Sequence, residues 1–299
     1  MANESIVFNG YCIEYIETQI PVIKRGFYLA KTLHVYIDGL ENAVVKGYIP
    51  QSKTPVVLGS TGVVRILEPG YNVDPGLSGS IAIVKPLSRN GVVGLDIDGL
   101  LSRYTSIPSD TLLTTVSDDK PEYTLLYSLA TGLKASSLAE GKRYLVIGAG
   151  LSGIASALTA TNTLETTVYT EDNMVYRILR RQGVSVYRKW SELHGCYDIV
   201  YYSSLSTKYM GLLDKILCGE AAILLNPLYA RVNSIALRVS IDKIVIEEVR
   251  VDKEAICRAY SLLNKFKRYV KTIEVDTLKQ IQSLIPVRSL GVIVSIKPR

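Results

Sequence analysis

The chain has 299 residues, of which 47% are hydrophobic and 21% are charged, and its formal net charge is +6. This composition is typical of a globular protein with one large or two medium-sized domains. Its four cysteines, Cys12, Cys196, Cys218 and Cys257, are far apart in the sequence. That spacing argues against a disulfide framework or a zinc finger and favours a cytoplasmic protein.

Basic residues cluster in two places, at 177–183 and at 264–271. No aromatic stacking platform or recognition-helix motif accompanies them, so we interpret them as solvated helix faces and expect no nucleic-acid partner. The first residues, "MANESIVFNG", lack a basic region followed by an apolar stretch, and we therefore expect no signal peptide.

The first third of the chain is predicted to be a β-rich module. Short β-branched or alternating runs punctuated by glycine and proline recur at 6–16, 32–39, 55–70, 79–86 and 99–110. A helix and linker are predicted for 121–142. This pattern ends the first module near residue 120.

The sequence pattern changes after Gly141, where predicted strands alternate with predicted helices. Strands are predicted at 143–149, 166–171, 184–188, 197–204, 221–227 and 243–249, with helices between them that include 208–220. Alternation of this kind favours a doubly wound parallel sheet. The tail is predicted to be helical over 252–284 and to end in a strand at 291–298.

The stretch "RYLVIGAGLSGIASALTATNTLETTVYTE", residues 143–171, carries no charge between Tyr144 and Leu164. Its length permits a membrane span. Three glycines in six positions at a strand-to-helix corner, the Ser and Thr residues that follow, and the α/β pattern on both sides argue against one. We therefore expect no membrane partner.

The same stretch contains the spacing typical of a dinucleotide-binding corner. Gly148 permits the tight turn, Gly150 lets a diphosphate approach the backbone, and Gly153 lets the helix pack closely on the strand. The helix that begins with Leu151 and Ser152 would present unpaired N–H groups and the positive end of its dipole to the phosphates. The context of strand, turn and helix favours nucleotide binding over a purely structural turn.

Three polar residues at later strand ends complete the predicted cofactor site. Glu171 lies about 20 residues beyond the glycines, where an acidic side chain accepts hydrogen bonds from the adenosine ribose, and it favours NAD. Arg177, Arg180 and Arg181 on the next helix would instead suit the 2′-phosphate of NADP. Ser203 and Asn226 follow strands at the carboxyl edge, where ligands bind, although turn formation explains them equally well.

Four segments in order resemble the medium-chain dehydrogenase/reductase family, the relatives of zinc-dependent alcohol dehydrogenases. "VVLGSTGVV", "GLDIDGLLSRYTSIPSD", "LLYSLATGLKA" and "GKRYLVIGAGLSGIASAL" are similar to the family's catalytic-domain strand, its dGxxaEY turn, its interdomain helix and its nucleotide fingerprint. The resemblance implies a GroES-like β-rich catalytic domain, 1–125 completed by 255–299, and a Rossmann NAD(P)-binding domain, 126–254. It also implies hydride transfer between the domains and a homodimer or homotetramer.

The zinc positions of the family are where this chain departs. Gly59-Ser60-Thr61 stands where zinc-dependent members have G-H-E, and no cysteine occurs in the region of Asp38 to Asn42 that matches C-G-T/S-D. Tyr127 replaces the Glu of E-P-L-A, and the four-cysteine lobe is missing. His34 and His194 lie outside the expected ligand positions. Catalytic zinc needs about three Cys, His or carboxylate ligands, so we expect neither catalytic nor structural zinc.

Without zinc, the residues left to carry the chemistry are a set of hydroxyls and acids. Ser60 or Tyr127 could donate to a developing oxyanion, and Asp38 or Glu41 could transfer a proton, with Thr61 beside them. Capping, turn or packing roles remain equally open for all five. The sequence thus favours a zinc-independent NAD(P)-dependent oxidoreductase acting on a small carbonyl, enone or quinone. The alternatives are a catalytically degenerate nucleotide-binding or regulatory protein and a zinc alcohol dehydrogenase with unusual ligands.

Overall fold

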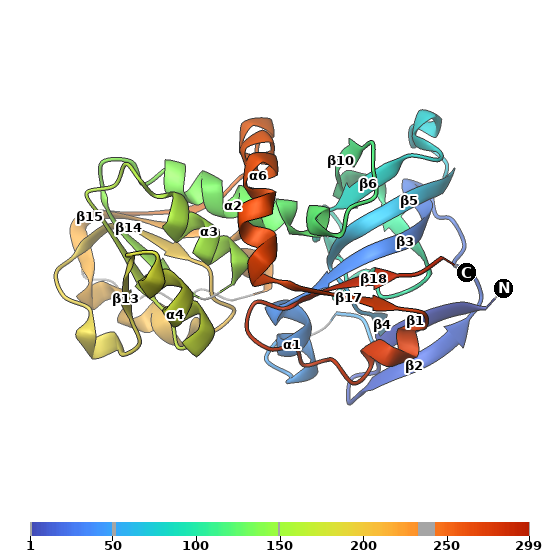
Figure 1. The fold of residues 1–299 in the computed structure, drawn as a ribbon, viewed down its shortest axis with the longest axis horizontal. Coiled ribbons are helices and arrows are strands. Elements are labelled where there is room, and N and C mark those ends of the chain that lie inside the picture. Colours follow the sequence, from blue (N-terminus) through green and yellow to red (C-terminus); the bar gives the residue numbers. More distant parts are fainter. Residues whose placement is uncertain (1, 50–51, 149, 233–242, 299) are drawn as a thin grey trace. The chain divides into compact units, whose positions relative to one another are not determined.

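The computed structural model describes residues 2–49, 52–148, 150–232 and 243–298. Contacts divide the chain into two compact units, one formed by the chain up to Leu125 and again from Lys267 on, the other by Leu126–Phe266. Figure 1 shows the elements of both units. Among the described residues no helix is both long and apolar enough to cross a membrane.

The first unit is built mainly from antiparallel strands. One sheet has the order β2-β1-β4, with β1 at Asn3–Phe8, β2 at Ile13–Thr18 and β4 at Val56–Val57. The larger sheet has the order β10-β6-β5-β3-β18-β17, and β9 also pairs with β3. Its strands are β3 (Phe27–Ile37), β5 (Thr61–Pro69), β6 (Ile81–Val84), β9 (Tyr104–Pro108), β10 (Leu112–Val116), β17 (Lys271–Val275) and β18 (Val292–Ile296). The small hairpin of β7 (Leu87–Ser88) and β8 (Gly91–Val92) and the helix α1 (Gly39–Val45) complete the unit.

The second unit is a doubly wound parallel sheet. Its six strands have the order β13-β12-β11-β14-β15-β16, so the direction of strand addition reverses between β11 and β14. The strands are β11 (Arg143–Ile147), β12 (Glu165–Tyr169), β13 (Ser185–Tyr187), β14 (Tyr197–Tyr202), β15 (Leu217–Leu225) and β16 (Lys243–Glu248). The helices are α2 (Leu126–Ser137), α3 (Leu151–Thr159), α4 (Asn173–Arg181), α5 (Pro227–Val232) and α6 (Lys253–Phe266). This order and the reversal are those of a Rossmann fold, in which ligands bind at the switch point.

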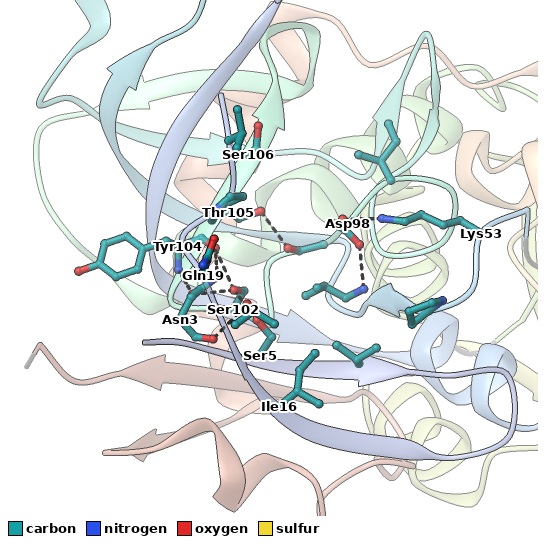
Figure 2. Close-up of a pocket in the computed structure, with 18 of the residues that line it drawn as sticks. Asn3, Ser5, Ile16, Gln19, Lys53, Asp98, Ser102, Tyr104, Thr105 and Ser106 are labelled. Carbon is teal, nitrogen blue, oxygen red and sulfur yellow. Dashed lines mark hydrogen bonds and ion pairs between the residues drawn. The ribbon is translucent and has the colours of Figure 1, made fainter. Parts of the chain in front are cut away.

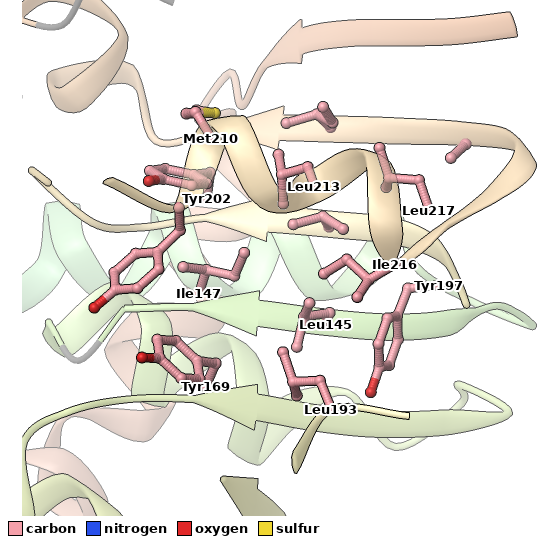
Figure 3. Close-up of a cluster of buried hydrophobic side chains, with 14 of the residues drawn as sticks. Leu145, Ile147, Tyr169, Leu193, Tyr197, Tyr202, Met210, Leu213, Ile216 and Leu217 are labelled. Carbon is pink, nitrogen blue, oxygen red and sulfur yellow. The ribbon is translucent and has the colours of Figure 1, made fainter. Parts of the chain in front are cut away.

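One face of this sheet is buried by a cluster that is rich in tyrosine. Tyr169, Tyr197, Tyr202 and Tyr209 pack there with aliphatic residues of the strands and of the 3-10 helix Thr207–Lys215 (Figure 3). A buried tyrosine needs a partner for its hydroxyl group, and the Tyr202 hydroxyl donates to the Ser206 carbonyl at 2.5 Å. The 20 tyrosines of the chain therefore serve in part as core residues whose polar ends reach the sheet edge.

Three predictions differ from the structure. The tail predicted to be helical over 252–284 contains β17 at Lys271–Val275, because these residues pair with β18 in a parallel ladder. The helix predicted at 208–220 ends at Lys215, and β15 already begins at Leu217, because Leu217 pairs with Tyr197 in the parallel ladder. The sequence also assigned residues 255–299 to the first domain, whereas α6 lies in the second unit and the chain returns only at Lys267. The apolar face of α6 is buried, and Lys134 on α2 pairs with Asp252 just before α6 at 2.7 Å.

Gly132 on α2 lets this helix approach α3 closely, and we expect Gly132→Ala to destabilise the protein. An added Cβ would lie 2.2 Å from the Ser152 carbonyl oxygen and 2.9 Å from the Ala155 Cβ. Such overpacking lowers the free energy of unfolding by about 1–3 kcal/mol. Gly211→Ala is the matched control, since nothing lies within 4 Å of its Cβ position. Equal urea midpoints for the two variants would contradict this packing.

Candidate functional site

The corner after β11 has the geometry that a diphosphate requires. Gly148 has φ +120°, and a Cβ there would lie 2.2 Å from the Ser203 carbonyl oxygen, so no other residue fits. Gly150 is the N-cap of α3, and no side-chain hydrogen bond caps this helix. The Cβ position of Gly153 lies 3.1 Å from the Gly148 carbonyl oxygen, which places the helix directly against the turn. Ala149 lies outside the described residues.

The corner offers backbone N–H groups, and a tyrosine hydroxyl group lies close to it. Leu151 is 3% exposed, so its side chain packs inside the protein and is not available to a ligand. The Tyr229 hydroxyl on α5 lies 3.4 Å from the Cβ position of Gly150. Tyr229 was not predicted from the sequence, although this residue follows β15, which ends at Leu225, and so belongs to the same carboxyl edge.

Ser152, Ser203 and Asn226, three of the predicted cofactor residues, meet beneath the corner. The Ser152 and Ser203 hydroxyl groups lie 2.8 Å apart, and the Asn226 amide donates to Ser152 Oγ at 3.0 Å. That amide also donates to the Tyr201 hydroxyl at 3.1 Å. All three residues are buried. Their side chains therefore bind one another and tie α3 to the ends of β14 and β15, and their contact with a cofactor remains a prediction.

Glu171 stands just beyond the end of β12 and is exposed. Hydrogen bonds from Tyr209 and Lys208 lower the pKa of its carboxyl group, with Lys208 Nζ at 3.0 Å. Trp190 stacks on Tyr209 with ring centroids 5.5 Å apart, and both rings contact Tyr169. The adenosine end of the predicted site thus contains an ionised acid, an exposed lysine paired with it and an aromatic cluster.

Asp38 and Glu41 lie in the first unit and cap α1. The Asp38 side chain accepts from the Leu40 N–H at 2.8 Å, and the Glu41 side chain accepts from the Asp38 N–H at 2.9 Å. This reciprocal pair is a capping box. Burial raises the pKa of both carboxyl groups, and the proximity of Asp38 adds to the shift at Glu41. The pair therefore retains a proton at neutral pH.

Ser60 and Thr61 lie beside that pair and are also buried. The Ser60 backbone N–H donates to Glu41 Oε1 at 3.2 Å, and Thr61 pairs with Tyr36 in the ladder between β5 and β3. Four of the five predicted catalytic residues are thus brought together in the first unit. Tyr127 lies in the second unit on α2, where it is 6% exposed and burial raises the pKa of its hydroxyl group.

The donor set in the first unit does not fit zinc. Within the described part of the chain no three His, Cys, Asp or Glu side chains come close enough to hold a metal ion. His34 is engaged elsewhere, with Ser295 at 2.9 Å and Asp119 at 2.5 Å. Two carboxyl groups already bound to backbone N–H groups, beside a neutral serine, cannot replace three zinc ligands.

A cavity of about 580 Å³ in the first unit lies apart from these residues (Figure 2). The β1–β2 hairpin and the segments 53–57 and 96–106 line it, and none of the predicted catalytic residues does. Its polar lining is largely bonded within the protein: Ser102 Oγ donates to Asn3 Oδ1 at 3.0 Å, and Lys53 pairs with Asp98 at 2.5 Å.

Glu41 gives the stability of the protein a specific pH dependence. Its pKa rises from 4.5 to about 8 on folding, so the free energy of unfolding falls as the pH increases through this window. Glu41→Gln removes this titration. The difference in unfolding free energy between wild type and Glu41→Gln should therefore change by up to about 1.4 kcal/mol per pH unit between pH 4.5 and 8 and stay constant above. Glu220→Gln, at an exposed position, is the control. A difference independent of pH in urea titrations would contradict the assignment.

Comparisons with known proteins identify the fold. No protein-family model and no curated protein matches the chain. Benzyl alcohol dehydrogenase from Acinetobacter calcoaceticus superposes with a TM-score of 0.75 at 14% identity, over 99% of this chain and all of that one. Acetophenone reductase from Geotrichum candidum in complex with NAD gives 0.74 at 16% identity, over 98% and 97% of the two chains.

A thermostable alcohol dehydrogenase from Pyrobaculum aerophilum gives a TM-score of 0.72 at 16% identity, over 99% of this chain and 100% of that one. Alcohol dehydrogenase-like structures thus match both units from end to end. The expected GroES-like unit and Rossmann unit are confirmed. The chain therefore has the two-domain fold of the medium-chain dehydrogenase/reductase structures that its sequence resembles.

Proposed function

We propose that this protein is an NAD(P)-dependent oxidoreductase that transfers hydride to or from a carbonyl, enone or quinone without catalytic zinc. The observation that carries the proposal is the glycine corner at the switch point of the parallel sheet. There Gly148 cannot bear a side chain, and the first turn of α3 has no side-chain cap. Backbone N–H groups at such a helix start bind phosphate.

Each part of the nucleotide has candidate partners in the second unit. The start of α3 would hold the diphosphate, and the Tyr229 hydroxyl is close enough to the corner to donate to it. Glu171 would accept from the ribose hydroxyls, which favours NAD over NADP. Lys208, 3.0 Å from Glu171, offsets part of that preference because its ammonium group attracts a 2′-phosphate.

The nicotinamide supplies or accepts the hydride, and the protein must stabilise the charge that develops on the substrate oxygen. Zinc would contribute several kcal/mol to that task, but the donors present do not fit it. The Asp38–Glu41 pair retains a proton at neutral pH and could donate it. Enones and quinones delocalise the developing charge, so they require less Lewis-acid help than simple ketones.

A second function, nucleotide binding without catalysis, is favoured by a different observation. Glu41, Ser60, Thr61 and Tyr127 are each no more than 6% exposed, and both Glu41 carboxyl oxygens accept backbone N–H groups. Buried side chains with these hydrogen bonds have a sufficient role in packing and helix capping. Without catalysis, the protein would bind the nucleotide as a redox-linked regulatory module. For either function we propose that the protein forms homo-oligomers.

We expect Gly150→Ala to weaken nucleotide binding without unfolding the protein. Its Cβ would lie 3.4 Å from the Tyr229 hydroxyl, an ordinary contact, but the methyl group would occupy the side from which a diphosphate approaches. The dissociation constant of NADH should rise by about tenfold or more, since 1.4 kcal/mol corresponds to a factor of ten. Quenching of Trp190, the single tryptophan, reports the binding. Gly219→Ala, with open space at its Cβ position, is the control, and equal constants would contradict the site.

We expect NADH or NADPH oxidation with at least one aldehyde, ketone, enone or quinone, at a rate that a chelator does not change. Asp38→Asn should lower kcat by about 100-fold, the lower range for loss of general acid–base catalysis, while the NADH dissociation constant stays the same. Nucleotide binding with no turnover on any acceptor would establish the second function. Activity that disappears with the chelator and returns with zinc would contradict both the zinc-independent oxidoreductase and the non-catalytic binding protein.

A further inference from the structure

A second chemical feature lies at the opposite edge of the Rossmann sheet from the glycine corner. Arg143 begins β11, Cys196 precedes β14, and Cys218 is the second residue of β15. The strands run parallel, so these residues gather at the amino edge, whereas the nucleotide corner lies at the carboxyl edge. All four cysteines of the chain are free, and Cys196 and Cys218 are half-buried.

One guanidinium group joins the two thiols. Arg143 Nη2 lies 3.3 Å from Cys196 Sγ and 3.1 Å from Cys218 Sγ, and the two thiols are within hydrogen-bonding reach of each other. The neighbours Tyr197 and Leu217 pair in the ladder and point into the core. Side chains alternate along a strand, so Cys196 and Cys218 share the opposite face of the sheet.

Asp198 completes the cluster, and its contact with Cys218 makes the surroundings of the two cysteines different. It accepts the Arg143 backbone N–H at 2.8 Å and a hydrogen bond from Cys218. Burial, followed by the hydrogen bonds with Cys196 and Asp198, raises the pKa of Cys218 to about 12. Cys218 is therefore held as a thiol beside an acceptor for its proton, which suits it to the second step of a thiol oxidation. Cys196, in contact with the Arg143 cation, is left for the first step.

We propose that Cys196 and Cys218 form a reactive dithiol that hydroperoxides convert into an intramolecular disulfide. Cys196 gives its proton to solvent and its sulfur attacks one peroxide oxygen. The O–O bond breaks, the departing hydroxide takes up a proton from solvent, and a sulfenic acid and water result. The Cys218 thiol passes its proton to Asp198, and its sulfur attacks the Cys196 sulfur. The S–O bond then breaks, and the departing hydroxide leaves as water with that proton. In total two thiols and one hydrogen peroxide give one disulfide and two waters.

The ladder at this point can accommodate the bond. The partner of β14 on β15 shifts from Leu217 opposite Tyr197 to Ala222 opposite Ile199, so the residues from Cys218 to Ala221 form an irregular stretch. Nothing lies within 4 Å of the Cβ position of Gly219 in that stretch. Backbone adjustment there can bring the two Cα atoms to the separation that a disulfide requires.

The full-length Cys12→Ser/Cys257→Ser protein, which retains only the candidate pair, is the reagent that tests the proposal. Hydrogen peroxide should reduce its Ellman-reactive thiols from two to none. A non-reducing digest should contain one cross-linked peptide pair that is lighter by two hydrogens. In the matched variant that also carries Cys218→Ser, Cys196 should instead stop at a sulfenic acid that dimedone traps.

The rate of thiol loss tests the role of the cation. Arg143→Gln should slow oxidation by about tenfold because it removes the cation that contacts both sulfur atoms, whereas Arg143→Lys should retain most of the rate. Two thiols that persist, separate sulfinic acids, or disulfides between chains would overturn the proposal. The outcome does not depend on nucleotide binding, because the cluster and the glycine corner lie at opposite edges of the sheet.

Discussion

The close approach of backbone to backbone at Gly148 is the constraint on which the proposed nucleotide site depends. The turn after β11 passes so near the Ser203 carbonyl that a Cβ atom would lie 2.2 Å from it, and the positive φ of Gly148 favours glycine independently. The first turn of α3 follows directly, and no side-chain hydrogen bond caps it. The buried hydroxyl and amide network of Ser152, Ser203 and Asn226 then fixes the helix to the ends of two further strands. A diphosphate would meet a binding surface that is already in place, so little entropy would be lost in ordering it.

The first unit uses its charged residues differently. At the positions that the resemblance assigns to zinc ligands, this chain has two carboxyl groups that cap α1 and hold the Ser60 backbone. Burial of paired carboxyl groups is costly for the ionised form, so the pair keeps a proton. Loss of this proton at high pH lowers the stability of the protein, and the same proton could be donated to a substrate. Asp38 and Glu41 can both cap the helix and donate a proton. Proton donation is the role that would distinguish an enzyme from a binding protein.

Sequence patterns predicted the fold well because the signals are local. Alternating apolar residues, glycine punctuation and the Gly148-x-Gly150-x-x-Gly153 spacing each act within one strand or turn, and their order gave both units. The direction in which side chains point was harder to predict from the sequence. Ser203 and Asn226 were placed at the correct edge, but whether they point toward a ligand or toward each other depends on contacts between residues far apart in sequence. Tyr229 and the thiol pair were missed for the same reason, since Cys196 and Cys218 meet only through strand pairing. The helix predicted at 208–220 was wrong from Leu217 on, because hydrogen bonds in the strand ladder outweigh the helical periodicity of these residues.

Binding of a dinucleotide diphosphate at the Gly148 corner can be measured by calorimetric titration of this chain with ADP-ribose, NAD and NADP. ADP-ribose carries the diphosphate and the adenosine without the nicotinamide, so it isolates the corner from the reacting end. We expect one ADP-ribose to bind per chain, and ADP-ribose and NAD to compete for the same site. No measurable binding of any of the three, together with an unchanged unfolding temperature, would contradict binding at this corner.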